Sequence, residues 1–145
     1  MPSTEPFVSV HLDAVPAGPD RGSGVGELKP VRRHLGIEAF GANARVARKA
    51  GDLLVMPHDE RAGGPYGTEG HEELFVVLRG HATFTVDGRE VDAPAGTLVF
   101  VRDPAVVRSA VATEAGTAVL GVGAAPGEAY RVAPWEQRDI DASQP

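Results

Sequence analysis

The stretch Gly70–Val101, GHEELFVVLRGHATFTVDGREVDAPAGTLVFV, decides the fold. It begins with Leu74–Leu78, a continuous apolar run of the kind found in strands that are buried on both faces. Ala82–Val86 then alternates apolar and polar residues, which is the period-two pattern of a half-buried strand. The dipeptide Asp87–Gly88 predicts a tight hairpin turn, because glycine tolerates the positive φ that such a turn requires. A third apolar run follows at Thr97–Val101, and hairpins this closely spaced predict an antiparallel sandwich or barrel.

Further strands are predicted on both sides of this stretch. Residues 40–47 alternate, and the set that we expect to face inward includes the small residues Ala42 and Ala44, which would leave room for a pocket. Leu53–Met56 predicts the next strand, and Thr117–Val122 predicts the last one. The apolar side chains predicted to be largely buried are Phe75, Val77, Phe84, Val86, Leu98, Phe100 and Leu120.

Composition limits the class of protein. The chain has 145 residues, enough for one domain, and its 18 glycines and 12 prolines favour a turn-rich β protein. A net charge of −6 weighs against a nucleic-acid partner, which would need a positive surface. The absence of cysteine excludes disulfides, thiolate nucleophiles and cysteine-bound zinc. Neither a long apolar run nor a signal-peptide pattern occurs, so we expect a cytoplasmic protein without a membrane partner.

Two segments resemble the cupin motifs. Glu73, which six residues separate from Gly80, is similar to the second half of the first motif, and Gly96–Val101 with Pro104 is similar to the start of the second. The resemblance extends over roughly half the chain. It implies an all-β double-stranded β-helix, the cupin jelly-roll barrel, over residues 31–125, with an irregular N-terminal arm at 1–30 and a C-terminal tail at 126–145.

The arm and the tail suggest a homodimer. Phe7, Val8 and Val10 predict a short strand that covers a sheet edge or pairs with a second subunit, because exposed sheet edges need covering. In the tail, Tyr130 and Trp135 would bury apolar area against the barrel or the partner.

The candidate site starts at Pro57–Glu60. Residues two apart in a strand share a face, so His58 and Glu60 are expected to point together. On the alignment that the resemblance favours, His58 matches the first cupin histidine, Glu60 replaces the second and Glu73 matches the glutamate, with His71 as an extra or substitute ligand. An alternative alignment keeps a shorter spacing and destroys this site. It places Tyr66 or Gly67, and Thr68 or Glu69, at the histidine positions.

One imidazole and two carboxylates suit a divalent cation such as Mn²⁺, Fe²⁺, Ni²⁺ or Zn²⁺. Without a metal, two inward carboxylates would repel each other and one would act as a general base, which makes Glu60 and Glu73 the catalytic candidates. A third interpretation is that His58 and Glu60 are polar residues at a strand end with no chemical role. The candidate substrate-binding residues are Tyr66, Phe75, Val107 and Arg108.

The second motif departs from the family pattern, because Val107 stands where cupins carry their last histidine. In the register that we expect, Val107, Ser109 and Val111 point inward and Arg108 points outward. A bulge at Pro104 would instead turn Arg108 inward, where it would favour a carboxylate or phosphate ligand.

The predicted function is therefore a cupin that binds a small molecule in its barrel. The resemblance implies a divalent-metal-dependent enzyme of isomerase, cyclase, dehydratase or oxygenase type, and the alternative is a non-catalytic binding or sensor module that has lost its metal site.

Overall fold

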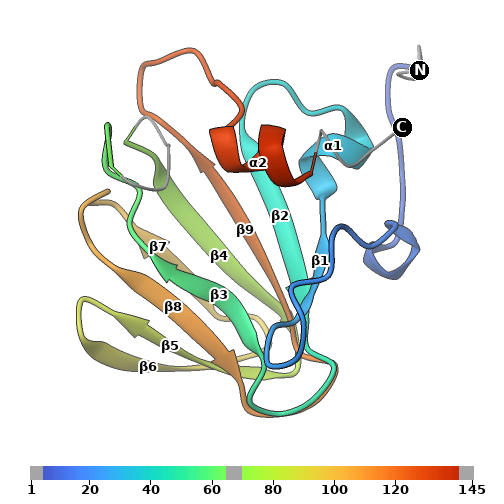
Figure 1. The fold of residues 1–145 in the computed structure, drawn as a ribbon, viewed down its shortest axis with the longest axis vertical. Coiled ribbons are helices and arrows are strands. Elements are labelled where there is room, and N and C mark those ends of the chain that lie inside the picture. The colour runs from blue at the N-terminus through green and yellow to red at the C-terminus, as the bar shows by residue number, and fades with distance from the viewer. Residues whose placement is uncertain (1–4, 65–69, 141–145) are drawn as a thin grey trace.

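The computed structural model describes residues 5–64 and 70–140, which form two facing antiparallel sheets with two short α-helices at one end (Figure 1). The elements in chain order are a 3-10 helix (Leu12–Ala14), β1 (Glu27–Lys29), α1 (Val31–Leu35), β2 (Gly41–Val46), β3 (Leu53–His58), β4 (Glu72–Arg79), β5 (His81–Val86), β6 (Arg89–Pro94), β7 (Leu98–Val101), β8 (Arg108–Ala112), β9 (Ala118–Ala124) and α2 (Pro134–Asp139). None of the helices in the described ranges is long and apolar enough to cross a membrane.

The five-stranded sheet has the order β1-β2-β9-β4-β7, and the four-stranded sheet has the order β3-β8-β5-β6. All pairs of neighbouring strands are antiparallel. The two sheets enclose the apolar core, in which the Phe75 and Phe84 rings lie 5.5 Å apart. This architecture confirms the predicted all-β jelly roll. Its first strand, β1, lies within the range 1–30 that was assigned to the arm.

Part of the predicted core is confirmed and part is wrong. Phe75, Val77 and Phe84 are buried, and Val86 and Leu120 are half-buried. Leu98 and Phe100 are instead 66% and 46% exposed. The reason is the pairing of β7 with β4: Val99 lies opposite Phe75, so Val99 and Val101 face the core and the alternate residues face outward.

The inward set of β2 is also the opposite of the predicted one. Asn43 pairs with Gly121, which pairs with Phe75, so Asn43 and Arg45 share the interior face with Phe75. Ala42 and Ala44 therefore face the outside of the sheet, where they are nevertheless buried.

The segment after β9 closes one end of the molecule. It ends in α2, whose first turn starts at Pro134, and Ile140 behind it is fully buried. Glu136 of α2 accepts hydrogen bonds from Arg32 Nε at 2.5 Å and from Asn43 Nδ2 at 2.8 Å, so the tail is fixed to α1 and β2 of its own chain. At the other end of the chain, Phe7, Val8 and Val10 are exposed and form no strand, so that prediction was wrong.

Candidate metal and ligand site

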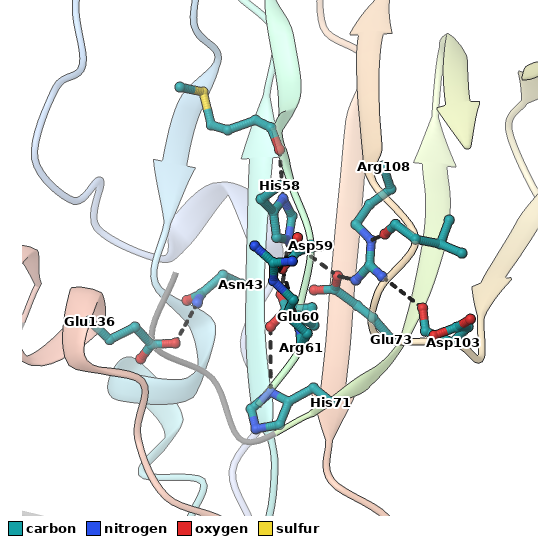
Figure 2. Close-up of polar contacts among 12 residues, drawn as sticks. Asn43, His58, Asp59, Glu60, Arg61, His71, Glu73, Asp103, Arg108 and Glu136 are labelled. Atoms are coloured by element: carbon teal, nitrogen blue, oxygen red, sulfur yellow. Dashed lines mark hydrogen bonds and ion pairs between the residues drawn. The ribbon is translucent and has the colours of Figure 1, made fainter. Parts of the chain in front are cut away.

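His58, at the end of β3, is held between oxygen atoms. Its Nδ1 lies 2.6 Å from the carbonyl oxygen of Met56, and its Nε2 lies 2.9 Å from Glu60 Oε1 and 3.5 Å from Glu73 Oε1 (Figure 2). A carbonyl and a carboxylate both accept hydrogen bonds, so both ring nitrogens act as donors. The charged imidazolium form satisfies both contacts at once.

The pKa of His58 reflects the same surroundings. Burial by itself lowers the pKa, since it disfavours the charged ring, but hydrogen bonds to Glu60 and Glu73, the negative charge of Glu73 and the bond to the Met56 carbonyl outweigh it. The result is a pKa of about 10, raised from 6.5. In the metal-free protein His58 is therefore the cation that separates two carboxylates.

Arg108 supplies a second cation, and its position corrects the register expected from the sequence. The side chain is completely buried, whereas Val107 is 53% exposed and Val111 is 36% exposed. Arg108 Nη1 donates to Glu73 Oε1 at 3.1 Å, and its Nε donates to the Val106 carbonyl at 3.0 Å (Figure 2). Arg108 therefore turns inward, as in the alternative register, but the irregularities lie in the pairing of β3 with β8 and not at Pro104. Two register shifts between β3 and β8 accompany it and place Arg108 directly opposite His58.

Three of the predicted metal ligands come together. One donor atom each from His58, Glu60 and Glu73 lies within 4.8 Å of the others. An imidazole nitrogen and two carboxylate oxygens at this spacing fit a hard or borderline divalent cation. The fourth candidate, His71, is buried at the edge of the group, with its Nδ1 4.0 Å from Glu60 Oε2 and its ring centroid 5.8 Å from that of Tyr130.

This group lies at one end of a cavity of about 390 Å³, a volume typical of small-molecule sites. Phe75, a candidate substrate-binding residue, lines the cavity. Val107 points away from it, and Arg108 lies behind Glu73 and outside the cavity lining. Tyr66 falls outside the described residues, as do all four positions of the alternative alignment.

The cavity owes its space to glycine in β9. Gly121 and Gly123 lie between interior-facing residues of β2 and β4, where any other residue would place a side chain in the cavity. A Cβ atom on Gly121 would approach the Phe75 ring to 3.2 Å, and one on Gly123 would lie 3.0 Å from the Glu72 carbonyl oxygen. Glycine in a strand interior is a known sign of close approach, and this signal was present in the sequence.

Sequence reasoning missed the cavity wall formed by β2 and the tail. Asn43, Arg45, Tyr130 and Glu136 line the cavity from that side. The two β2 residues were missed because the alternation of residues 40–47 was assigned to the wrong face. The tail residues were expected to pack on the barrel, but nothing in their spacing indicates a cavity.

Comparisons with solved structures agree on the fold. A Silicibacter pomeroyi protein, described as a sugar phosphate isomerase from a cupin superfamily, superposes with a TM-score of 0.61 at 15% identity. The match covers 81% of this chain and 76% of that chain. An RmlC-like cupin from Shewanella frigidimarina gives a TM-score of 0.55 at 20% identity, over 88% and 97% of the two chains. KdgF from a Halomonas species gives a TM-score of 0.54 at 19% identity, over 73% and 84%.

No family model matches the chain, and no curated protein matches it. The structural similarities nevertheless establish its architecture: the chain has the cupin fold, as the resemblance of its two motifs predicted.

Proposed function

We propose that the protein is a divalent-metal-dependent enzyme that binds a small organic molecule inside the barrel and transfers a proton on it. The observation that carries this proposal is the convergence of His58, Glu60 and Glu73 at one end of a cavity large enough for a metabolite. Of the reactions expected from the sequence, isomerisation is favoured, because the Silicibacter protein that shares the fold is described as a sugar phosphate isomerase.

The residues have distinct roles in this proposal. His58, Glu60 and Glu73 would hold the ion, which when bound supplies a Lewis acid that polarises a substrate oxygen. Glu60 is assigned to proton transfer because its carboxylate lines the cavity and its Oε2 faces His71 at 4.0 Å. His71 also lines the cavity, so it can exchange the proton with the substrate.

One observation favours a second function, a non-catalytic binding module. Arg108 already neutralises part of the Glu73 charge, which reduces the attraction of this carboxylate for a metal ion. A cupin in which an arginine competes for a metal ligand is compatible with ligand binding without chemistry.

The enzyme proposal requires that the protein binds a divalent metal ion, so metal binding is tested first. Mn²⁺ is titrated into wild type and Glu73→Gln, and free Mn²⁺ is measured by electron paramagnetic resonance. We expect Glu73→Gln to bind at least about tenfold more weakly, since even outer-shell partners of metal ligands are worth that much. Glu72→Gln is the matched control: it removes the same charge from the adjacent residue, which faces the other side of β4. Equal affinities for wild type and Glu73→Gln would refute the metal site.

Proton transfer is then tested directly. The Mn²⁺-loaded protein is incubated in D₂O with a panel of hydroxyaldehydes, hydroxyketones and their phosphates, and deuterium uptake beside the carbonyl is followed by NMR. At Mn²⁺ concentrations that saturate both proteins, we expect uptake with wild type and at least about a hundredfold slower uptake with Glu60→Gln, the usual contribution of a general acid–base group. Metal binding without any uptake across the panel would favour the binding module.

A further inference from the structure

Arg45 stands in the cavity wall without a carboxylate partner. It lies on the interior face of β2, its side chain is half-buried, and its Nη1 donates to the Gly26 carbonyl at 3.0 Å. Within residues 5–64 and 70–140, no carboxylate lies within ion-pairing distance of its guanidinium group. A guanidinium group that is taken out of water without a counter-charge is costly, so such a residue calls for an explanation.

Neighbouring charges increase this cost. The pKa of Arg45 is lowered to about 10, first by burial and then by the positive charges of Arg21 and Arg48. On the cavity rim, Arg21 and Arg138 share one carboxylate, that of Asp139, at 2.5 and 2.9 Å. Arg21, Arg45 and Arg138 all line the cavity, but Asp139 pairs with Arg21 and Arg138, and Glu136 is engaged by Arg32.

This basic end lies opposite the His58–Glu60–Glu73 group. Along the interior face, Arg45 is four residues from Gly41, and Gly41 is in the same row as Gly123 and Glu73. With about 3.3 Å per residue and about 4.8 Å between strands, the Arg45 and Glu73 Cα atoms are about 16 Å apart. Both residues line the same cavity, and Gly121 and Gly123 of β9 lie between their rows without a side chain. The remaining gap suits a small molecule with one reacting end and one charged end.

We infer that Arg45 binds the anionic group, a carboxylate or a phosphate, of a small molecule whose other end lies at His58, Glu60 and Glu73. Arginine is suited to this role because its planar fork binds such groups through two parallel hydrogen bonds. The inference rests on the proposed function for the position of the reacting end, and it adds the class of substrate: a small organic anion.

Anion binding is measured with inorganic phosphate and with malonate, each titrated at constant ionic strength and followed by the amide signals of Asn43 and Gly121. The variants are Arg45→Gln, Arg45→Lys and Arg48→Gln. We expect Arg45→Gln to weaken binding at least about tenfold, the usual worth of a charge-assisted hydrogen bond. Arg45→Lys keeps the charge without the fork and should be intermediate. Arg48→Gln removes the same charge from an exposed side chain outside the cavity lining and should stay within about twofold of wild type.

Mn²⁺ binding by the same variants distinguishes a failure of the anion-binding inference from a failure of the proposed metal-dependent function. Arg45→Gln should bind Mn²⁺ as tightly as wild type, which also shows that it is folded; if it does not fold, Arg45→Lys carries the test. Binding of phosphate alone, malonate alone or both, weakened by the Arg45 substitutions, supports the inference and identifies the group. Binding of neither anion to wild type at millimolar concentration, or equal binding to all variants, overturns it. Failure of wild type to bind Mn²⁺ would instead refute the proposed function, whatever the anion result.

Discussion

Arg108 and His58 approach the same carboxylate oxygen. Arg108 Nη1 lies 3.1 Å from Glu73 Oε1, and His58 Nε2 lies 3.5 Å from that atom. Two cationic side chains thus hold one glutamate in place in the metal-free barrel. A metal ion entering the candidate site would have to displace the proton of His58 and share Glu73 with Arg108, so these two cations would weaken its binding.

Replacing Arg108 should therefore change stability and metal affinity in opposite directions. Arg108→Met removes a buried hydrogen-bonded ion pair, which should lower the free energy of unfolding by about 3 kcal/mol without metal. Because Glu73 is then released from Arg108, Mn²⁺ affinity should rise several-fold, and Mn²⁺ should recover part of the lost stability. Chemical denaturation with and without Mn²⁺ measures both effects. The control is Arg89→Met, an exposed arginine at the start of β6. Weaker Mn²⁺ binding by Arg108→Met would show that the guanidinium group supports the metal site and does not compete with it.

His58 predicts how stability depends on pH in the metal-free protein. Its pKa is raised from 6.5 to about 10 on folding, so the charged ring stabilises the native state fully below pH 6.5. That contribution should be lost as the pH rises from 6.5 to about 10. The measurement is the difference in unfolding free energy between wild type and His58→Gln, taken across this range. A difference that stays constant, or ring NMR shifts of a neutral imidazole at pH 8, would contradict the prediction.

Two phenylalanines of neighbouring runs should respond very differently to truncation. Phe84 is fully buried in the core, so Phe84→Ala should cost about 3–5 kcal/mol. Phe100 is 46% exposed on the outer face of β7, so Phe100→Ala should cost less than about 1.5 kcal/mol. Urea denaturation of the two variants compares them directly, and similar losses would mean that β7 has the opposite register.

The outer face of the five-stranded sheet predicts self-association. Leu78, Leu98 and Phe100 are exposed there, beside the half-buried Leu74 and Val76, and β7 is an edge strand. An apolar face of this kind at a sheet edge is a typical interaction surface. We expect a homodimer in light scattering at micromolar concentration, and a monomer for the double variant Leu98→Lys with Phe100→Lys.

The matched control places lysine on the other sheet, at Val107 and Val111, which are also exposed. This control should remain dimeric. A monomeric wild type would refute the dimer, and a dimer that only the control disrupts would move the interface to the four-stranded sheet.

Local signals predicted the elements of the fold well. The hairpin at Asp87–Gly88 has positive φ at both residues, 53° and 74°, as its sequence required. Gly80 also has a positive φ and follows the last residue of β4, where the sequence placed a strand end. These features depend on a few adjacent residues, so they are readable without knowledge of the rest of the chain.

The direction in which side chains point was harder to predict. In the run Leu98–Val101 every residue is apolar, so alternation carries no information about which face is buried, and only pairing with β4 decides it. The register shifts between β3 and β8 determine that the Arg108 side chain points inward. The pairing of β2 with β9 determines that Arg45 lies on the interior face. A one-residue error in register therefore gave Arg108 the wrong preferred orientation and hid Arg45, whereas His58 and Glu60 were found because they are two residues apart.

Gly121 affects how long a molecule the cavity can hold. Its missing side chain leaves open the path between the basic end at Arg45 and the acidic end at Glu73, and a Cβ atom there would lie 3.6 Å from Glu73 Oε2. A single methyl group, as in Gly121→Ala, would narrow that path, and its closest contact would be with the Phe75 ring at 3.2 Å and not with the candidate metal ligands. Molecules long enough to reach both ends would then be excluded, whereas a bare ion or a compact ligand would still enter. If the proposed function holds, Gly121 therefore affects which ligand lengths the cavity accepts, in addition to the charge that Arg45 would select.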